Sequence, residues 1–307
     1  MEFKDGVINI NKPQGLTSQD VCARLRRRLH IRKIGHTGTL DPMATGVLPV
    51  CTGKATRIIE YYNNDLKSYH AEMKLGIVTD TLDITGTVTE ENDFSGITED
   101  DIRRAFACYT GLITQTPPRY SALKINGRRA YDLAREGREF EIKGREITIY
   151  SNDISSIDLS KGLIVFDVTC SKGTYIRTIC DDIGRDLGCG AVMTALTRTG
   201  SGCFCLNEAL DLDIINEISD KELDSYILPM DETLCGLGVI SLNDNRVIAY
   251  LNGNTSNTGY RIEKSSDFRL KGSEELSVYR IYGNNRFLGT GHIEKGVLIP
   301  NKVIAGK

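Results

Sequence analysis

Residues 35 to 46 read Gly-His-Thr-Gly-Thr-Leu-Asp-Pro-Met-Ala-Thr-Gly, and this stretch carries the main indication of fold and function. Its three glycines permit tight bends and close backbone approaches, because glycine tolerates positive φ. Pro42 biases Asp41 toward an extended backbone, which restricts the direction of its side chain. Asp41 is therefore either an ordinary turn residue, the more frequent role of Asp beside Gly, or a chemical reagent held in a stiff turn.

Charge is distributed unevenly along the chain, although the 307 residues sum to a net charge of −3. Residues 21–40 hold six Lys or Arg and no acid, whereas residues 75–102 hold eight Asp or Glu and no base. The total therefore hides a polarised surface. The basic stretch is either a solvated helix face or a surface for phosphate groups.

The length of the chain allows one large domain, with or without a second small one.

The composition is typical of a cytoplasmic globular protein. The N-terminus lacks the basic and then apolar pattern of a signal peptide, and no apolar run approaches the roughly 18 residues of a membrane span. Nine cysteines without a C-x-x-C pair are typical of reduced thiols in the cytosol. We therefore expect a cytoplasmic protein without membrane association.

Several cofactor and metal chemistries do not fit the motifs. Gly53-Lys54 resembles part of a phosphate-binding loop, but Gly46 stands too far upstream and Ala55 replaces the required hydroxyl. Four histidines without an i, i+4 pair do not suit a metal site, and the hydrolase motif G-x-S-x-G is missing. We expect neither cofactor nor metal, which leaves Asp41 as a nucleophile or an acid–base group.

Hydrophobic periodicity predicts a mixed α+β core without regular βαβ alternation. One helix is expected to begin at a cap at Thr17 or Ser18, since apolar residues then recur every four positions. Further helices are expected at 53–61, 98–109 and 174–187, and strands at 6–13, 68–75, 85–89, 146–157 and 163–170.

Two shifts in composition suggest how the chain is organised. Residues 115–145 contain Pro117-Pro118 and many basic residues, and they form either an RNA-facing flap or an ordinary excursion with a solvated surface. An acidic stretch at 207–224, expected to be helical, is followed by a run of short strands and Asn-Gly-type turns. We therefore expect a large domain over 1–235 and a small β-rich, barrel-like domain over 236–307.

Arg177 is a candidate partner for Asp41. A buried carboxylate stays ionised at neutral pH only when a cation or several donors stabilise it. Arg177 stands one turn inside the helix that follows the turn Ser171-Lys172-Gly173. The alternative is an ordinary surface arginine.

Residues 35–50 resemble the catalytic motif of the TruB family of tRNA pseudouridine synthases, in its bacterial stand-alone branch. The resemblance extends in family order over about residues 6–200. It includes the motifs Asn11-Lys12-Pro13-Gln14-Gly15, Tyr69 with Thr79-Asp80-Thr81-Leu82-Asp83, Gln115–Lys124, Cys170–Arg177 with Asp181-Asp182, and Leu196-Thr197-Arg198.

This resemblance implies a fold and a reaction. The fold is a mixed, largely antiparallel central sheet with flanking helices, followed by a small PUA-type barrel at 236–307. The reaction converts the T-loop uridine at tRNA position 55 to pseudouridine without cofactor or metal. The partner is the tRNA T stem-loop, and the enzyme is expected to be a monomer that requires no protein partner. The uridine must leave its stack, at a cost of a few kcal/mol.

The resemblance also assigns roles to seven residues. Asp41 is the catalytic group and acts on either the ribose or the uracil ring. Tyr69 stacks on the base and takes the C5 proton, and Arg177 pairs with Asp41. The remaining assignments are to substrate binding, by Tyr175, Leu196, Lys12 and His36. His36 contacts the everted bases or fills the gap that they leave, unless it is a structural histidine.

Two functions from other classes fit the sequence less well than this one. A non-catalytic RNA-binding module would have no chemical reason to keep Asp41, Tyr69 and Arg177 together. A glycosidase needs a second acid about 5 to 10 Å from the first. The candidates for that acid, Asp80 and Asp83, are better interpreted as parts of a structural turn.

Overall fold

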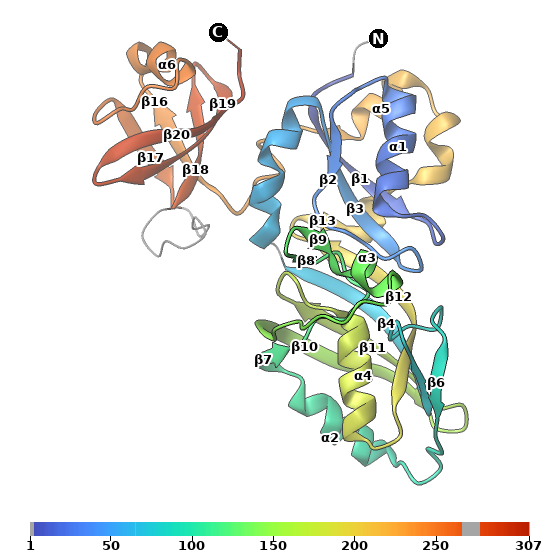
Figure 1. Ribbon diagram of the computed structural model, residues 1–307. Helices are drawn as coiled ribbons and strands as arrows, with labels where there is room; N and C mark the ends of the chain where they lie inside the picture. The colour runs from blue at the N-terminus through green and yellow to red at the C-terminus, as the bar shows by residue number, and fades with distance from the viewer. Residues whose placement is uncertain (1–2, 65, 266–276, 307) are drawn as a thin grey trace.

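The computed structural model describes residues 3–64, 66–265 and 277–306, which form a large sheet and a separate small sheet with helices around them (Figure 1). The mixed α+β class and the separate small sheet agree with the expectation from the sequence. Residues 266–276, part of the expected small domain, lie outside the described residues. No helix of the described part of the chain is long and apolar enough to cross a membrane.

The large sheet has 11 strands among the described residues, and its main path runs β14-β1-β3-β12-β4-β11-β10-β7. Most neighbours are antiparallel, and the parallel exceptions are β1 with β14 and β3 with β12. Its strands are β1 (Gly6–Lys12), β2 (Ile34–His36), β3 (Thr45–Thr52), β4 (Lys67–Leu75), β7 (Gly111–Gln115), β10 (Arg145–Asp158), β11 (Leu163–Cys170), β12 (Ala191–Ser201), β13 (Phe204–Cys205), β14 (Leu210–Asp211) and β15 (Ile227–Leu228).

The short parallel contact between β3 and β12 joins the two halves of this sheet. Thr45 and Gly46 pair there with Thr197 and Arg198. A Cβ on Gly46, whose φ is +100°, would lie 2.2 Å from the Arg198 carbonyl oxygen. Only glycine allows this approach, so the last residue of the glycine-rich stretch is needed for the junction of the two halves.

Helices pack against the sheet, and α1 does so with the apolar face that the sequence predicts. The helix α1 (Ser18–Leu29) begins at Thr17, whose side chain forms a capping box with Asp20, and it buries Val21 and Leu25. The other helices are η1 (Gly53–Asn64, a 3-10 helix), α2 (Glu99–Cys108), α3 (Ala130–Arg135), α4 (Ile176–Asp186), η2 (Leu206–Glu208), η3 (Leu212–Asn216), α5 (Asp220–Ser225) and α6 (Asp244–Leu251).

Two expectations about local structure were wrong. The stretch 207–224 is not one helix but η2, β14, η3 and α5 in succession, because residues 210 and 211 pair with β1 and interrupt it. The strand expected at 85–89 lies instead at β6 (Val88–Glu91), which pairs with β5 (Ile77–Thr79) outside the large sheet. The side chain of Asp83 bonds the amide of Thr85, so these residues form a turn.

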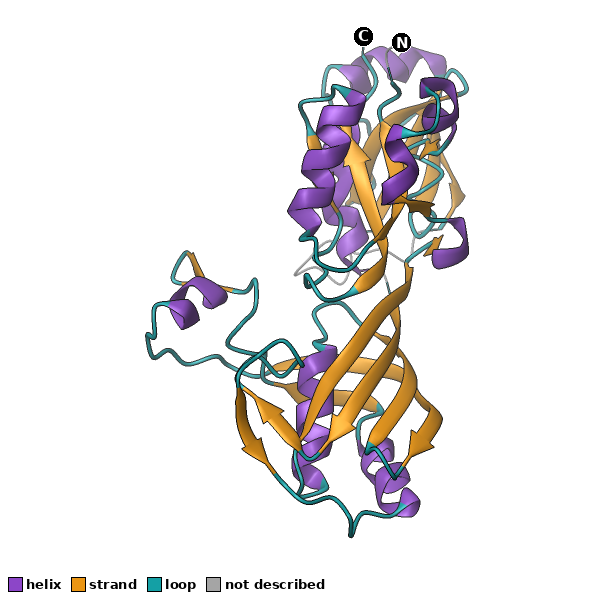
Figure 2. Ribbon diagram, turned by 90° about the vertical axis from the view of Figure 1, so that its right-hand side faces the viewer, coloured by secondary structure: helices purple, strands orange, loops and turns teal. Residues whose placement is uncertain are grey.

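The flap, defined here as residues 116–144, lies between β7 and β10. It contains α3 and a two-stranded hairpin of β8 (Lys124–Ile125) and β9 (Arg128–Arg129). Figure 2 shows it as an arm that projects from the body of the large sheet at mid-height. Its position leaves a cavity between the arm and the glycine-rich stretch.

The small sheet has the order β17-β16-β18-β19-β20, and its strands are β16 (Gly238–Leu242), β17 (Tyr260–Lys264), β18 (Val278–Gly283), β19 (Arg286–Glu294) and β20 (Val297–Val303). It packs against η1. The Tyr61 hydroxyl lies 2.8 Å from the Thr290 hydroxyl, and Arg57 donates to the Val303 carbonyl at 2.6 Å. Val278 and Ile304 complete an apolar cluster with Tyr61, which ties the small sheet to the large one.

Candidate active site

A cavity of about 960 Å³ lies between the glycine-rich stretch, the turn at 81–85, the start of α4 and the flap. Asp41, His36 and Arg177, all candidates from the sequence, contribute to its wall. The flap supplies the facing wall, with Tyr120, Tyr131 and three cationic side chains: Lys124, Arg129 and Arg135. The cavity therefore combines a carboxylate with basic and aromatic groups, a combination suited to nucleic acid.

The loop that carries Asp41 is fixed on both sides by hydrogen bonds. Leu40 exchanges two bonds with the Ser18 hydroxyl, at 2.9 and 3.2 Å. The Pro42 carbonyl accepts from the Gly15 amide at 2.8 Å, and the Ala44 amide donates to the Asp41 carbonyl at 3.1 Å. These bonds hold the turn in place and so fix the direction of the Asp41 carboxylate. Asp41 is thus a turn residue whose side chain is also oriented by the turn.

Arg177 connects several elements through one guanidinium. Its Nε lies 2.9 Å from Asp41 Oδ2, and its Nη1 lies 3.5 Å from Asp83 Oδ2. Nη1 also donates to the Thr81 carbonyl at 2.8 Å, and Nη2 donates to the Tyr120 carbonyl of the flap at 3.0 Å. Since the side chain is only 5% exposed, these bonds satisfy an otherwise costly buried charge.

The ionisation of Asp41 reflects opposing effects. Burial raises the pKa of its carboxyl above 3.8, although 35% of the side chain faces the cavity. Arg177 and, more weakly, Lys12 oppose this rise in pKa, whereas the charge of Asp83 adds to it. The result is a carboxylate that is less solvated and more basic than an exposed one, as suits a nucleophile or a proton acceptor.

Lys12 lies behind the loop rather than in the cavity wall. The residue is fully buried, and its ammonium donates to the carbonyls of Pro13, Leu16 and Pro42 at 2.9, 2.7 and 3.3 Å. Burial lowers its pKa to about 8, against the attraction of Asp41. The three donors of the ammonium are therefore all used by backbone carbonyls, and through Pro42 they tie the Asp41 loop to residues 13–16.

His36 contributes to the wall of the cavity. Its Nε2 is 3.2 Å from Nε2 of Gln19, at the start of α1. Burial lowers the pKa of the imidazole, and the charges of Arg198 and Arg129 lower it further. The ring is therefore neutral at physiological pH and able to stack or to exchange hydrogen bonds without carrying charge.

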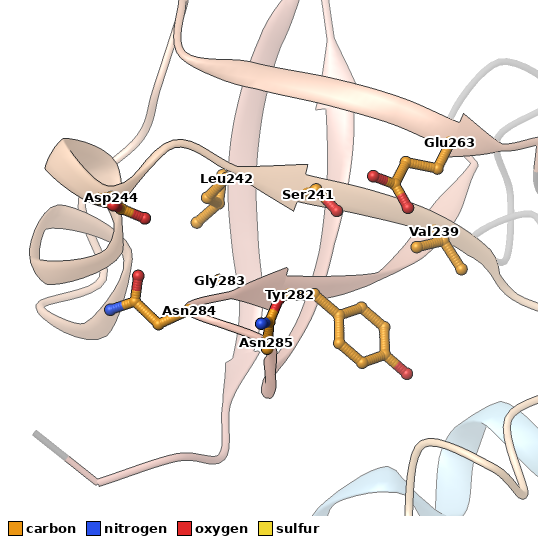
Figure 3. Close-up of a pocket in the computed structure, with 9 residues that line it drawn as sticks. All are labelled: Val239, Ser241, Leu242, Asp244, Glu263, Tyr282, Gly283, Asn284 and Asn285. Carbon is orange, nitrogen blue, oxygen red and sulfur yellow. The ribbon is translucent and has the colours of Figure 1, made fainter.

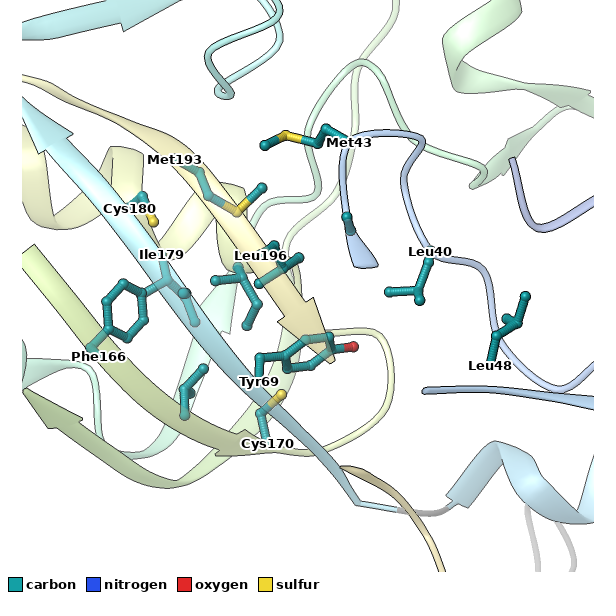
Figure 4. Packing of buried hydrophobic residues seen from close by; sticks show 14 of the residues in the cluster. Leu40, Met43, Leu48, Tyr69, Phe166, Cys170, Ile179, Cys180, Met193 and Leu196 are labelled. Carbon is teal, nitrogen blue, oxygen red and sulfur yellow. The ribbon is translucent and has the colours of Figure 1, made fainter. Parts of the chain in front are cut away.

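Tyr69 and Leu196 lie in the apolar core next to the cavity, and neither contributes to the cavity wall. Figure 4 shows them grouped with Cys170, the Tyr69 hydroxyl pointing to the side on which Leu40 lies. Burial raises the pKa of the Tyr69 phenol, and the charge of Asp41 is near enough to contribute to that rise. Tyr175 does not contribute to the cavity wall either, and its ring centre lies 5.2 Å from the guanidinium of Arg145.

Sequence reasoning did not assign functions to Asp83 and Arg198. Asp83 joins the Arg177 network, while hydroxyls of Thr81 and Thr85 bond its other oxygen. The threonines around an acid in residues 79–85 were a usable signal, because hydroxyls and amides orient a carboxylate.

Arg198 supports the loop from beneath. The residue is 1% exposed and donates to the Val47 carbonyl at 2.6 Å and to the Gly38 carbonyl at 3.3 Å, on either side of Asp41. It also hydrogen bonds the Tyr69 hydroxyl, an interaction that opposes the rise in the phenol pKa. No pattern in the sequence distinguishes this arginine from a surface one.

The described ranges 3–64, 66–265 and 277–306 contain no group of three or more His, Cys, Asp or Glu side chains placed to hold a metal ion. A second cavity of about 790 Å³ lies over the small sheet, between Glu263 on β17 and the turn Asn284-Asn285 (Figure 3). It is lined by mixed polar groups that include the carboxylates of Asp244 and Glu263, and it lacks the cations of the first cavity.

Two family models and several named relatives match the chain. Residues 26–176 match the model of the TruB family pseudouridylate synthase N-terminal domain, and residues 177–235 match that of the tRNA pseudouridylate synthase B C-terminal domain. The chain is 42% identical to tRNA pseudouridine synthase B of Clostridioides difficile (strain 630), over 94% of each chain. It is 44% identical to the protein of that name from Clostridium perfringens (strain 13 / Type A), over 98% of this chain and 99% of the relative.

Solved structures are similar as well. The crystal structure of a Cbf5-Nop10-Gar1 complex matches with a TM-score of 0.74 and 27% identity, over 100% of this chain and 87% of that chain. A structure of an H/ACA RNP bound to a substrate RNA containing 2'-deoxyuridine matches with a TM-score of 0.72 and 25% identity, over 99% of this chain and 86% of that chain.

Proposed function

Because the chain belongs to the TruB family of tRNA pseudouridine synthases, which are isomerases, we propose that it converts the T-loop uridine at tRNA position 55 to pseudouridine. The observation that carries this proposal is the Asp41–Arg177 ion pair at the wall of a cavity that the basic flap overhangs. We further propose that the enzyme acts in the cytoplasm as a monomer, without cofactor or metal.

The proposed reaction balances without an external reagent. The N1–C1′ bond breaks, the uracil turns, and C5 bonds to C1′. The proton lost from C5 is matched by one gained at N1, so substrate and product are isomers. Asp41 attacks either the ribose or the ring while ionised, and Arg177 holds its carboxylate in place.

The substrate base must leave the T loop before it reaches Asp41. His36 and the flap aromatics line the space next to Asp41, where displaced bases would need partners. Extruding the base costs a few kcal/mol, which stacking on aromatic groups offsets at about 1 to 3 kcal/mol per base. We assign Lys12 a positioning role, because its ammonium is already bonded to the Pro42 carbonyl of the Asp41 loop and to the carbonyls of Pro13 and Leu16.

The small sheet is proposed to be a PUA-type RNA-binding domain over 236–307, following a catalytic domain over 1–235. Its support is the packing of β18 to β20 against η1 of the large domain. A firm attachment would allow the small domain to extend the RNA surface without a hinge.

The direct experiment is incubation of the protein with a T stem-loop RNA that carries uridine at position 55, followed by detection of pseudouridine. We expect conversion at this position and none in an RNA that carries cytidine there. A protein that binds the stem-loop but leaves the uridine unchanged would support the RNA-binding module instead. The glycosidase alternative requires a free second acid, and Asp83 is engaged by Arg177 and two threonines.

Substitutions of Tyr69 separate stacking from proton removal. Tyr69→Phe keeps the ring and removes the hydroxyl, so we expect normal binding and a rate reduced about 10²-fold, in the range of general-base contributions. Tyr69→Ala removes the ring as well, so the RNA should also bind more weakly. Tritium release from C5-labelled uridine measures the rate. A parent-like rate in Tyr69→Phe would exclude the proton-acceptor role, and equal activity and affinity of the two variants would exclude the stacking role.

Salt should weaken RNA binding although the net charge is −3. The basic groups of the flap and α1 face the RNA as a local surface, but Arg28 already bonds Asp220 and two carbonyls. We expect a log–log slope of about −0.7 for each neutralised phosphate when single-stranded behaviour applies. A salt titration of stem-loop affinity tests this, and a flat response would contradict an electrostatic surface.

A further inference from the structure

The flap leaves and rejoins the large sheet through two residues that face each other. Gln115 ends β7 and Arg145 begins β10, and the two are direct partners in the antiparallel register. Both side chains turn to one short segment, residues 173–177, which leads into α4 and contains Arg177. The base of the flap is thus in contact with the segment that holds the proposed catalytic ion pair.

Gln115 bonds the backbone of Tyr175 in both directions. Its Nε2 donates to the Tyr175 carbonyl at 3.0 Å, and its Oε1 accepts from the Tyr175 amide at 2.8 Å. Gln115 is only 1% exposed, so water does not compete for these bonds. Tyr175 is the residue before the first turn of α4, and its own side chain makes no capping bond. The Gln115 amide therefore fixes the direction in which this helix starts.

Arg145 holds the same segment from the other side. Its guanidinium lies 5.2 Å from the centre of the Tyr175 ring, within cation–π range, and its Nη2 donates to the Gly173 carbonyl. Gly173 has a φ of +81°, and a Cβ there would lie 2.9 Å from Nη2. Glycine at this position allows the arginine to approach the backbone.

The segment held in this way carries the cation of the proposed reaction. Arg177 stands two residues after Tyr175 and places its Nε 2.9 Å from Asp41 Oδ2. Its Nη2 is also bonded to the flap, at the Tyr120 carbonyl. Movement of the flap base would shift Tyr175 and with it the guanidinium that faces Asp41.

We propose that Gln115 and Arg145 are positioning residues that couple the flap to Arg177, so that the flap position adopted on bound RNA sets the alignment of Arg177 with Asp41. This inference rests on the proposed function, because its readout is pseudouridine formation. It assigns the flap a second role besides contact with RNA. A misplacement of 1 Å at a reacting group costs up to about 10²-fold in rate, so a small shift of the flap base would be enough.

The test compares Gln115→Ala and Arg145→Ala with the matched control Arg103→Ala, which removes an exposed arginine of α2 that pairs with Glu99 outside the flap. We expect Gln115→Ala and Arg145→Ala each to lose about 10- to 10²-fold in single-turnover rate at saturating stem-loop RNA. Their RNA dissociation constants should stay within about threefold of the parent value, less than 1 kcal/mol. Arg103→Ala should keep the parent's saturated rate.

The pH dependence of the rate distinguishes positioning from a merely structural effect. The part that matters is its acid limb, the fall in rate toward low pH as the catalytic carboxylate takes up a proton. Asp41 faces the charged groups Arg177, Asp83 and Lys12, and of these Arg177 does most to hold down its pKa. When Arg177 is displaced, the pKa of Asp41 rises. The acid limb of Gln115→Ala and of Arg145→Ala should therefore move to higher pH. Arg145→Lys, which keeps a cation near the Tyr175 ring, should move it less than Arg145→Ala.

An acid limb that stays at the parent position in Gln115→Ala and Arg145→Ala overturns the proposal, and so does a loss confined to RNA affinity. If Gln115→Ala melts at a lower temperature than the parent, the acid limbs of Arg145→Lys and Arg145→Ala decide instead. Equal positions of those two acid limbs would then overturn the proposal. Failure of the proposed function is a separate result, because the parent protein itself would then leave uridine-55 unconverted.

Discussion

Asp41→Asn is expected to abolish pseudouridine formation, with a loss of at least about 10⁴-fold in single-turnover rate, as for other essential nucleophiles. The amide is nearly isosteric, and its oxygen still accepts from Arg177, so the loop and the cavity should keep their shape. It carries no charge and is a poor nucleophile and base. The affinity for a T stem-loop RNA should therefore stay within about threefold of the parent value, less than 1 kcal/mol.

The same substitution should not cost stability at neutral pH, because Arg177 keeps the Asp83 carboxylate as its partner. Burial raises the folded-state pKa of Asp41 above its ordinary value of 3.8. The stabilisation that comes with its bound proton is complete below pH 3.8 and is lost as pH rises through the folded-state pKa. Asp41→Asn escapes that loss, so its melting temperature at pH 7 should equal or exceed that of the parent, with the difference shrinking as pH falls.

A matched control is Asp80→Asn, since Asp80 is an exposed carboxylate that bonds the Thr87 amide in the neighbouring turn. It should keep nearly full activity. Turnover by a clean preparation of Asp41→Asn, or an equal loss in Asp80→Asn, would remove Asp41 from its proposed role. Purification from a host without its own enzyme of this type excludes contamination.

Local patterns predict the parts of this fold whose local and tertiary preferences agree. The Thr17 cap and the repeats of Val21 and Leu25 locate α1, because the capping box and the apolar face are both encoded nearby. The stretch 207–224 could not be predicted in this way. Its local composition favours a helix, but a parallel contact of Leu210 with Ile10 places two of its residues in the large sheet.

The site shows the same division. The glycine-rich stretch and its single carboxylate are visible in the sequence, since the turn and the reagent share residues 35–46. The functions of Arg198 and Gln115 are not, because their partners lie far away in the chain: Arg198 bonds Gly38 across 160 residues, and Gln115 bonds Tyr175 across 60. Such residues become apparent only when the fold brings the backbone groups that they satisfy into reach.

Arg177→Met is expected to reduce the single-turnover rate about 10³-fold and to destabilise the protein by about 3 to 5 kcal/mol, the cost of removing one partner from a buried ion pair. The substitution leaves the Asp41 and Asp83 carboxylates without the cation that lies between them. The Thr81 and Tyr120 carbonyls also lose their donor. Arg177→Lys keeps the charge, but one ammonium cannot reach four acceptors on three segments, so its rate should also fall.

The pH profile separates the loss of charge from the loss of geometry. Arg177 is the largest influence that lowers the pKa of Asp41, so Arg177→Met should raise that pKa further and move the acid limb toward neutral pH. Arg177→Lys should leave the acid limb nearer to the parent position while its plateau rate stays low. Adding Asp83→Asn to Arg177→Met removes the facing charge and should restore part of the stability and of the acid limb, but not the rate. The neutral amide at position 83 relieves repulsion without aligning Asp41. Recovery of the rate in the double variant would therefore show that Arg177 acts only through its charge. An unmoved acid limb in Arg177→Met would show that Arg177 does not act on Asp41 at all.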